Sequence, residues 1–294
     1  MKVFDVFLFN NELDLLEIRL NVLNEYVDYF VISESETTFS GEKKELYYEK
    51  NKHLFKKFEN KIIHNIITEP TQQDLDLVSI LYDIKNYRTY QEDAYQKDSI
   101  KLILDKICSD EDIIIWSDLD EIPNPKSINA VLNSYDSSAV YNFAQDNFQG
   151  YLNLIEITGT VISQTPDNDL IWPKWIGTKI LSYFILKKYT LTQIRRPLNE
   201  NNIRIYPGGW HWSTVGSHNK STYEERVVNK IKKAAHFELN NEYYLNMVSQ
   251  RIKENRSPFG QDAATYKKID VCLENNYPEY LIENIDKYKY LIKD

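Results

Sequence analysis

The sequence predicts an α/β fold in which a mixed sheet is flanked by helices. In the first half, short apolar runs alternate with segments of helical spacing, which is the pattern of a mainly parallel sheet covered by helices. From Ala139 to Ile194 the residues Tyr, Phe, Ile and Thr dominate and helix signals are few. This change indicates further strands of a mixed sheet or a second lobe. We expect one domain over residues 1–294, divided into halves of about 1–135 and 136–294.

The first expected strand covers residues 3–9, which are rich in β-branched and aromatic side chains. Asn10 and Asn11 end it, and apolar residues from 13 to 23 then recur at helical spacing. Strands are expected at 29–32 and 62–67, with mixed helix and loop at 46–58 and a turn at 69–73. A long helix is expected from about 87 to 107, and Asn124-Pro125 opens another, with Pro125 suited to the first helical position.

A short apolar run, residues 113–116, ends at a cluster of acids, Asp118, Asp120 and Glu121. Such a run reads as a buried strand. In open α/β sheets the ligand crevice lies outside the carboxyl ends of the strands. Clustered carboxylates at that edge suit Mg²⁺ or Mn²⁺ shared with substrate phosphates. The first interpretation is therefore a divalent metal that holds a phosphorylated ligand, and the alternative is a solvated turn.

In the second half, Gly208-Gly209-Trp210-His211-Trp212-Ser213 interrupts the strand-like region. Helices are expected at 223–237 and 243–253, and the tail from residue 270 is helix-prone. Exposed tyrosine and tryptophan rings can stack on sugars, although many such residues fill cores with a polar tip that reaches water.

The composition excludes several classes of protein. The formal charge of −9 argues against nonspecific nucleic-acid binding. The two cysteines, Cys108 and Cys272, imply neither a disulfide framework nor a thiolate metal site. No run of about 18 to 20 apolar residues predicts a membrane span, and the first ten residues do not have the features of a signal peptide. A cytoplasmic protein is expected, and the oligomeric state is left open.

Five ordered blocks of the sequence resemble glycosyltransferase family 17. They cover most of the chain and comprise Asp5–Leu20, Val27–Ser35 followed by Thr38-Phe39-Ser40-Gly41, Trp116-Ser117-Asp118-Leu119-Asp120-Glu121-Ile122-Pro123, Gly208–Ser213, and Ala235-His236-Phe237-Glu238. In the segment Glu92–Asp98, lysine stands at position 97 where the family carries arginine, which keeps the charge but loses the bidentate fork.

The resemblance implies a GT-A-type, Rossmann-like fold and an inverting sugar transfer. It implies a UDP-sugar donor, typically UDP-GlcNAc, with Mn²⁺ (or Mg²⁺), and a glycan or glycolipid acceptor. Residues of about 1–135 would then form the nucleotide-sugar-binding half, and 136–294 the acceptor-side half with the C-terminal helices.

The resemblance also suggests roles for individual residues. Asp118, Asp120, Glu121 and His211 are candidate metal ligands; Asp118, Asn10, Asn11, Glu12, Glu34, Lys97, Asp98 and Trp210 are candidate donor contacts. Bland alternatives stay open for each: helix capping for Asn11, a solvated strand end for Glu34, a surface charge pattern for Lys97 and Asp98, and an aromatic core for Trp210 and His211. Inversion also needs a base for the acceptor hydroxyl, and the candidates are Glu238 first, then Asp146 and His236.

Two other functions compete with sugar transfer. A sugar nucleotidyltransferase would use the same acids but needs a Gly-rich, basic triphosphate loop, which Asn10-Asn11-Glu12 is not. A non-catalytic carbohydrate-binding protein is favoured only by the aromatic content.

Overall fold

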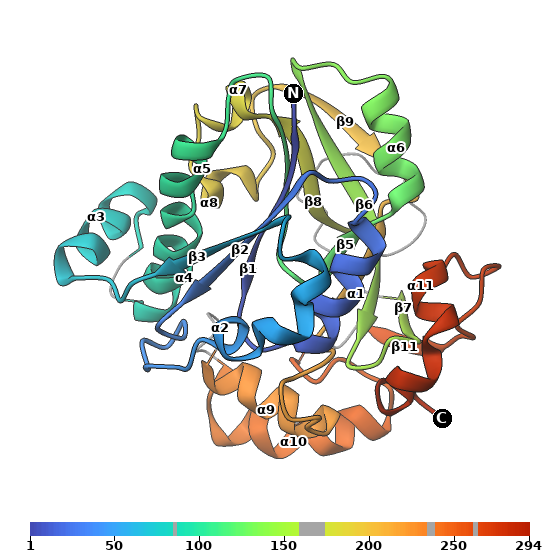
Figure 1. The fold of residues 1–294 in the computed structure, drawn as a ribbon. Coiled ribbons are helices and arrows are strands. Elements are labelled where there is room, and N and C mark those ends of the chain that lie inside the picture. Colours follow the sequence, from blue (N-terminus) through green and yellow to red (C-terminus); the bar gives the residue numbers. More distant parts are fainter. Residues whose placement is uncertain (85–86, 159–173, 234–238, 261–263) are drawn as a thin grey trace.

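The structure is a computed structural model that describes residues 1–84, 87–158, 174–233, 239–260 and 264–294. It is a mixed α/β fold in which one curled sheet is flanked by helices (Figure 1). The described residues form eleven strands: β1 (Val3–Phe9), β2 (Tyr29–Ser35), β3 (Ile62–Ile67), β4 (Ile113–Trp116), β5 (Glu121–Pro123), β6 (Ala139–Gln149), β7 (Leu154–Thr158), β8 (Lys174–Ser182), β9 (Asn201–Ile205), β10 (Gly209–Ser213) and β11 (Thr265–Lys268).

Helices connect and cover these strands. They are α1 (Leu13–Leu23), α2 (Tyr47–Asn51), α3 (Gln72–Tyr82), α4 (Arg88–Ser99), α5 (Lys101–Ile107), α6 (Pro125–Asn133), α7 (Tyr183–Leu186), α8 (Leu191–Ile194), α9 (Tyr223–Lys233), α10 (Glu242–Lys253) and α11 (Glu279–Glu283), with the 3₁₀ segments η1 (Lys52–Phe58) and η3 (Ile285–Leu291).

The strand order along the sheet is β11-β7-β6-β8-β4-β1-β2-β3, and β10 and β9 also pair with β6. Strands β4, β1, β2 and β3 are mutually parallel; Val6 of β1, for example, pairs with Val31 on one side and Trp116 on the other. Strand β8 runs antiparallel between β4 and β6. The parallel strands therefore end at one common edge, which is the edge nearest α9 in Figure 1.

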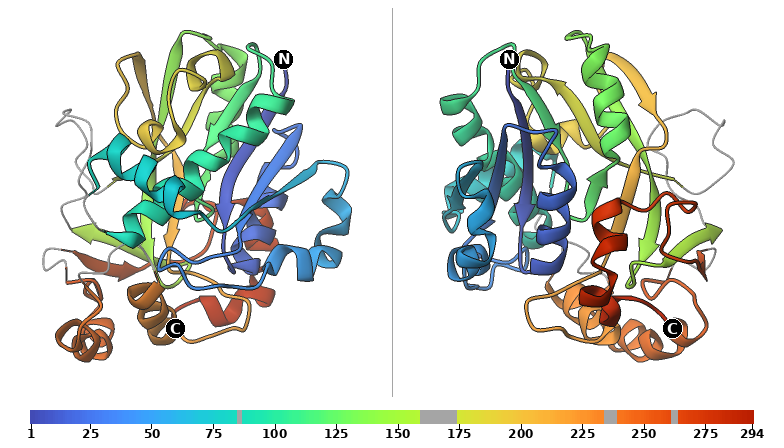
Figure 2. Two further views of the ribbon diagram at one scale, coloured as in Figure 1. Left: turned by 90° about the vertical axis from the view of Figure 1, so that its left-hand side faces the viewer. Right: turned by 45° about the vertical axis from the view of Figure 1, so that its right-hand side comes forward.

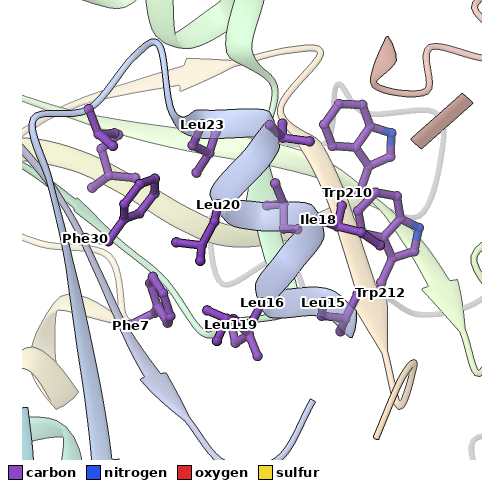
Figure 3. Packing of buried hydrophobic residues seen from close by; sticks show 14 of the residues in the cluster. Phe7, Leu15, Leu16, Ile18, Leu20, Leu23, Phe30, Leu119, Trp210 and Trp212 are labelled. Atoms are coloured by element: carbon purple, nitrogen blue, oxygen red, sulfur yellow. The ribbon is translucent and has the colours of Figure 1, made fainter. Parts of the chain in front are cut away.

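The two faces of the sheet carry separate cores because successive side chains of a strand point to opposite faces. Phe7 and Phe9 pack with α1, while Phe4 and Val6 of the same strand pack with the cluster that includes Ile100. The two views of Figure 2 show α1 on one side of the sheet and α4 and α5 on the other. Figure 3 shows the α1 core, which extends to the indoles of β10.

The expected strands at 3–9 and 62–67 and the helix from 13 to 23 are confirmed. The strand expected at 29–32 continues to Ser35. The helix expected from 87 to 107 is instead two helices that meet at Ile100. Just before this break the hydroxyl of Ser99 donates to the carbonyl of Tyr95, a side-chain bond that competes with the backbone ladder and bends helices.

Two further segments differ from expectation. The turn expected at 69–73 runs into helix α3, which opens with a capping box between Thr71 and Asp74. The segment expected to interrupt the sheet is itself strand β10. Gly209 has φ +114°, and a Cβ there would lie 2.2 Å from the carbonyl oxygen of Ile122. This glycine therefore permits close packing of β10 against β5.

Candidate functional site

A cavity of about 370 Å³ lies at the common edge where the parallel strands end. One wall comes from the segments that follow β1, β2 and β4, together with α4. The other wall comes from residues 214–221 and from α9. Its polar and charged lining includes Asn10, Asn11, Glu12, Thr37, Thr38, Lys44, Asp93, Gln96, Lys97, Asp118, Asp120, Ser217, His218, Arg226, Asn229, Lys230 and Lys233. The cavity thus brings together residues from both halves of the chain.

Asp118 and Asp120 stand in the loop between β4 and β5, and both line the cavity. The backbone of Asp120 is fixed to β10, since its carbonyl accepts from the amide of Trp212 at 2.8 Å. Burial works against the charge of Asp120, but His211 and Lys230 outweigh it and hold the pKa of this carboxyl below its usual range. Asp120 is therefore ionised at neutral pH.

Arg19 of α1 holds the same loop from beneath. Its side chain is fully buried and donates to both carboxylate oxygens of Asp5 on β1, at 2.8 and 2.6 Å. The remaining donors reach the loop: Nη1 contacts the carbonyls of Asp118, Leu119 and Glu121, and Nη2 contacts the hydroxyl of Ser117. One buried ion pair therefore fixes the path of the acidic loop relative to β1.

Arg195, which follows α8, holds the loop from the other side. Its guanidinium makes a bidentate pair with Glu121 at 2.6 Å for each nitrogen, and Nη2 lies 3.2 Å from Asp118. The indole of Trp175 also donates to Glu121. Burial would raise the pKa of Glu121, but the charge and hydrogen bonds of Arg195 outweigh burial and lower it. Glu121 does not line the cavity. Its carboxylate is engaged by Arg195 and Trp175, and these contacts support the loop.

His211 lies next to this loop but not on the cavity lining. Its Nε2 is 3.7 Å from the Asp120 carboxylate, and its ring stacks on Trp175 at a centroid distance of 4.5 Å. The buried Nδ1 has no hydrogen-bond partner among the described residues. The structure thus places His211 both beside Asp120 and against an aromatic ring.

The donor set available to a divalent cation is small. Among the residues that the structure describes, no cluster of three or more His, Cys, Asp or Glu side chains forms a metal cage. Asp118 and Asp120 nevertheless offer hard oxygen ligands to the cavity. Mg²⁺ and similar ions are commonly held by one or two carboxylates, with substrate phosphates and water completing the shell. The residues present fit such a shared ion.

The β1–α1 loop also faces the cavity, as expected for Asn10, Asn11 and Glu12. Asn11 does not cap α1 through its side chain. Its backbone N–H instead donates to the Glu12 carboxylate at 2.9 Å. Burial raises the pKa of Glu12, and the nearby charge of Asp120 adds to this effect.

Lys97 and Asp98 of α4 point to different places. Lys97 lines the cavity and pairs with Asp93 one turn earlier at 2.7 Å. Burial opposes its charge, but Asp93 and Asp118 outweigh burial and raise the pKa of Lys97. Asp98 does not line the cavity; it accepts from the hydroxyl of Tyr82 and from the amide of Thr192 at 2.9 Å.

Glu34 is fully buried beneath the cavity and does not line it. Its carboxylate accepts from the amide of Tyr48 at 3.2 Å and contacts Lys44 at 3.6 Å and His64 at 3.3 Å. Lys44 does line the cavity, and burial lowers its pKa. Glu34 therefore meets the cavity through Lys44.

The remaining candidates lie elsewhere. Trp210 is 2% exposed and stacks on Trp212 at 5.4 Å within the α1 core, so the structure gives it the core-packing role (Figure 3). Asp146 is on β6 and does not line the cavity. His236 and Glu238 lie outside the described residues.

Sequence reasoning missed Arg19, Arg195 and Lys230. Arg19 carried a usable signal, since a charged residue on the apolar stripe of a helix indicates a buried partner. Arg195 and Lys230 carried none, because each lies in a polar segment and reaches the site only through the fold.

The fold and site define a class: an α/β protein with a ligand cavity at the carboxyl ends of parallel strands, bordered by an acidic Asp-x-Asp loop. Within the described residues, no helix has the length and apolar character required to cross a membrane. The family model Glycosyltransferase family 17 matches residues 1–149, about half of the sequence. The chain belongs to glycosyltransferase family 17, and the family indicates a glycosyltransferase that acts on a sugar donor and an acceptor. No curated protein matches the sequence significantly.

Proposed function

We propose that the chain is an inverting, metal-dependent glycosyltransferase of the GT-A type that moves a sugar, GlcNAc in the first instance, from a UDP-sugar to a hydroxyl of a glycan or glycolipid. The observation that carries the proposal is the cavity itself. It combines the Asp-x-Asp loop, the loop after β1 and several lysines at the edge where α/β folds bind nucleotides.

In this proposal Asp120 and Asp118 hold a Mn²⁺ or Mg²⁺ ion. When bound, the cation neutralises negative charge on the diphosphate leaving group. Asp120 suits this role because its carboxylate stays ionised, whereas Arg195 already engages one oxygen of Asp118. We therefore rank Asp120 above Asp118, and we include His211 as a further ligand because of its 3.7 Å distance from Asp120.

The chain's own residues supply binding and orientation. Lys97 and the loop of Asn10, Asn11 and Glu12 line the space available to the nucleotide diphosphate. In an inverting transfer the acceptor oxygen bonds to the anomeric carbon while the bond to the diphosphate oxygen breaks, and a base takes the hydroxyl proton. Glu238 stays the first candidate for this base, followed by Asp146 and His236.

Nucleotide release from UDP-GlcNAc tests the proposal. We expect UDP release with Mn²⁺ and much less with EDTA, and a panel of other nucleotide sugars at equal concentration tests the donor. For variants of the cavity acids Asp118 and Asp120, Asp110→Ala is a suitable control that should leave UDP release unchanged. Asp110 is an exposed acid that pairs with Lys187 away from the cavity. Absence of both UDP release and UDP binding under any metal would leave the carbohydrate-binding alternative.

A further inference from the structure

We propose that Lys230 of α9 binds the diphosphate of the donor; the inference rests on the function proposed above. Lys230 lines the same cavity as Asp118, Asp120 and Glu12. Lys230 therefore shares the cavity in which the proposed metal and the phosphates would meet. It comes from the part of the chain beyond the family match, which ends at residue 149.

Other lysines that line the cavity already have carboxylate partners. The pairs are Lys44 with Glu34 at 3.6 Å, Lys97 with Asp93 at 2.7 Å, and Lys233 with Glu42 at 3.8 Å. Lys230 instead donates to the hydroxyl of Ser213 at 3.1 Å and lies over the ring of Phe259. Within the described part of the chain, no carboxylate is within ion-pairing distance of it. A cation of this kind in a cavity suits an anionic ligand.

The helix that presents Lys230 is firmly held. Arg226 lies one turn earlier on the same face, is 7% exposed, and donates to the carbonyls of Thr214 at 2.9 Å and Gly150 at 2.5 Å. These bonds tie α9 to the end of β10 and to the turn after β6. The position of Lys230 is therefore set by the sheet, which reduces the entropy lost when it binds a phosphate.

The proposed contact suits the chemistry of the leaving group. As the bond between the anomeric carbon and the diphosphate oxygen breaks, its electron pair moves to that oxygen and negative charge on the diphosphate increases. A protonated lysine attracts this charge and donates charge-assisted hydrogen bonds to phosphate oxygens. Lys230 acts here as a hydrogen-bond donor to phosphate, and the base that serves the acceptor hydroxyl is a separate group.

Calorimetric titration with UDP and with uridine tests the assignment, because the two ligands differ only in the diphosphate. With Mn²⁺ present, we expect Lys230→Ala to lose about 10- to 100-fold in UDP affinity, the loss typical of a hydrogen bond to a charged group. Uridine affinity should not change. Lys230→Arg should bind UDP within a few-fold of the unmodified protein. Lys232→Ala is the matched control, since Lys232 is exposed on the same helix and does not line the cavity.

Each alternative result has a distinct meaning. Equal UDP affinity for Lys230→Ala and the unmodified protein would overturn the role of Lys230 and leave the proposed function intact. A parallel loss of uridine affinity would also overturn it, because it would show a structural effect. If the unmodified protein binds no UDP, the proposed function fails as well. Should Lys230→Ala not fold, Lys230→Gln keeps most of the side chain, removes its charge and provides the same comparison.

Discussion

Two carboxyl groups of one cavity, Glu12 and Asp120, have pKa values displaced in opposite directions. Burial raises the pKa of Glu12, and Asp120 adds to the effect; His211 and Lys230 outweigh burial at Asp120 and lower its pKa. Displacement of neighbouring acids in opposite directions is a common sign of different roles at a site. Of these two groups, Asp120 is better suited to attract a cation, and the charge of Glu12 is less well tolerated.

Asp120→Asn is expected to abolish Mn²⁺-dependent UDP binding, because an amide keeps the shape but loses the charge that attracts the cation. The fold should persist, since the side chain lies in a loop and not in either core. Titration of UDP with and without Mn²⁺ measures the effect. Asp118→Asn should weaken binding less. Normal Mn²⁺-dependent binding by the Asp120 variant would remove Asp120 from the metal site.

Glu12→Gln is expected to raise the melting temperature at pH 7. The pKa of Glu12 in the folded protein lies above its ordinary value of 4.5, so this carboxyl ionises at lower pH in the unfolded chain than in the folded protein. The folded state is therefore stabilised at acid pH, and this stabilisation is lost as the pH rises through the folded-state pKa. Glutamine stays neutral and still accepts from the amide of Asn11. Melting curves from pH 4 to 8 should therefore converge at the acid end. A difference that grows toward acid pH would contradict this assignment.

At the residue scale, the sequence predicted the contacts that depend on neighbours in the chain. Asp118 and Asp120 follow a buried strand, so their place at the ligand edge follows from the α/β rule, and the same holds for Glu12. The prediction of donor contacts for Glu34 and Asp98 did not anticipate their partners. Glu34 is covered by Lys44, and Asp98 faces Tyr82. Which side of a strand end or helix meets the ligand depends on packing that a single sequence does not encode locally.

At the scale of elements, α1 and the β4–β5 loop behave as one unit through Arg19. Arg19→Met is expected to destabilise the fold by about 3–5 kcal/mol, because it leaves the Asp5 carboxylate buried and unpaired. Urea unfolding measures this loss. The double variant Asp5→Leu with Arg19→Met removes both charges and should recover much of the stability.

The double variant also separates stability from positioning. The carbonyls of Asp118, Leu119 and Glu121 would still lack the donors of Arg19. We therefore expect the double variant to fold yet to bind UDP with Mn²⁺ at least several-fold more weakly. Recovery of both stability and metal-dependent binding would show that Arg19 serves only to neutralise Asp5.

Elements were predicted best where hydrophobic periodicity is strong and local. The strand at 3–9 and the helix at 13–23 needed no tertiary information. Strand β10 was missed because Gly208 and Gly209 resemble a loop. The close approach of β6 to Gly208 and of β5 to Gly209 explains why glycine stands at the start of this strand. The start of helix α3 was missed because its capping box has Asp74, and not glutamate or glutamine, at the third helical position, and because the residues around Thr71 are polar and resemble a turn.

At the scale of the whole molecule, the family match ends inside the sheet. Residue 149 is the last residue of β6, and β6 pairs with β7, β8, β9 and β10, all of which follow it in the chain. Strand β8 also covers one edge of β4. The matched half therefore depends on the unmatched half for its central strand pairings.

A fragment of residues 1–149 is accordingly expected not to fold alone. Without β8, the apolar strand Ile113–Trp116 becomes an exposed edge, and exposed apolar edges favour aggregation. The full chain should unfold cooperatively, whereas the fragment should show no cooperative melting by circular dichroism. A monomeric fragment with a sharp transition would establish the first half as an independent domain.

The stacking of Trp175 on His211 has an optical consequence. The indole lies beside the residue that is 3.7 Å from Asp120, while Trp116, Trp210 and Trp212 are sealed in the cores. A paramagnetic ion held by Asp120 would quench the emission of indoles close to it, and these include Trp175 beside His211 and Trp212, whose backbone amide donates to the carbonyl of Asp120. The protein's own fluorescence would then report on occupancy of the cavity without any attached dye, and Mg²⁺, which is diamagnetic, would separate quenching from a change of shape.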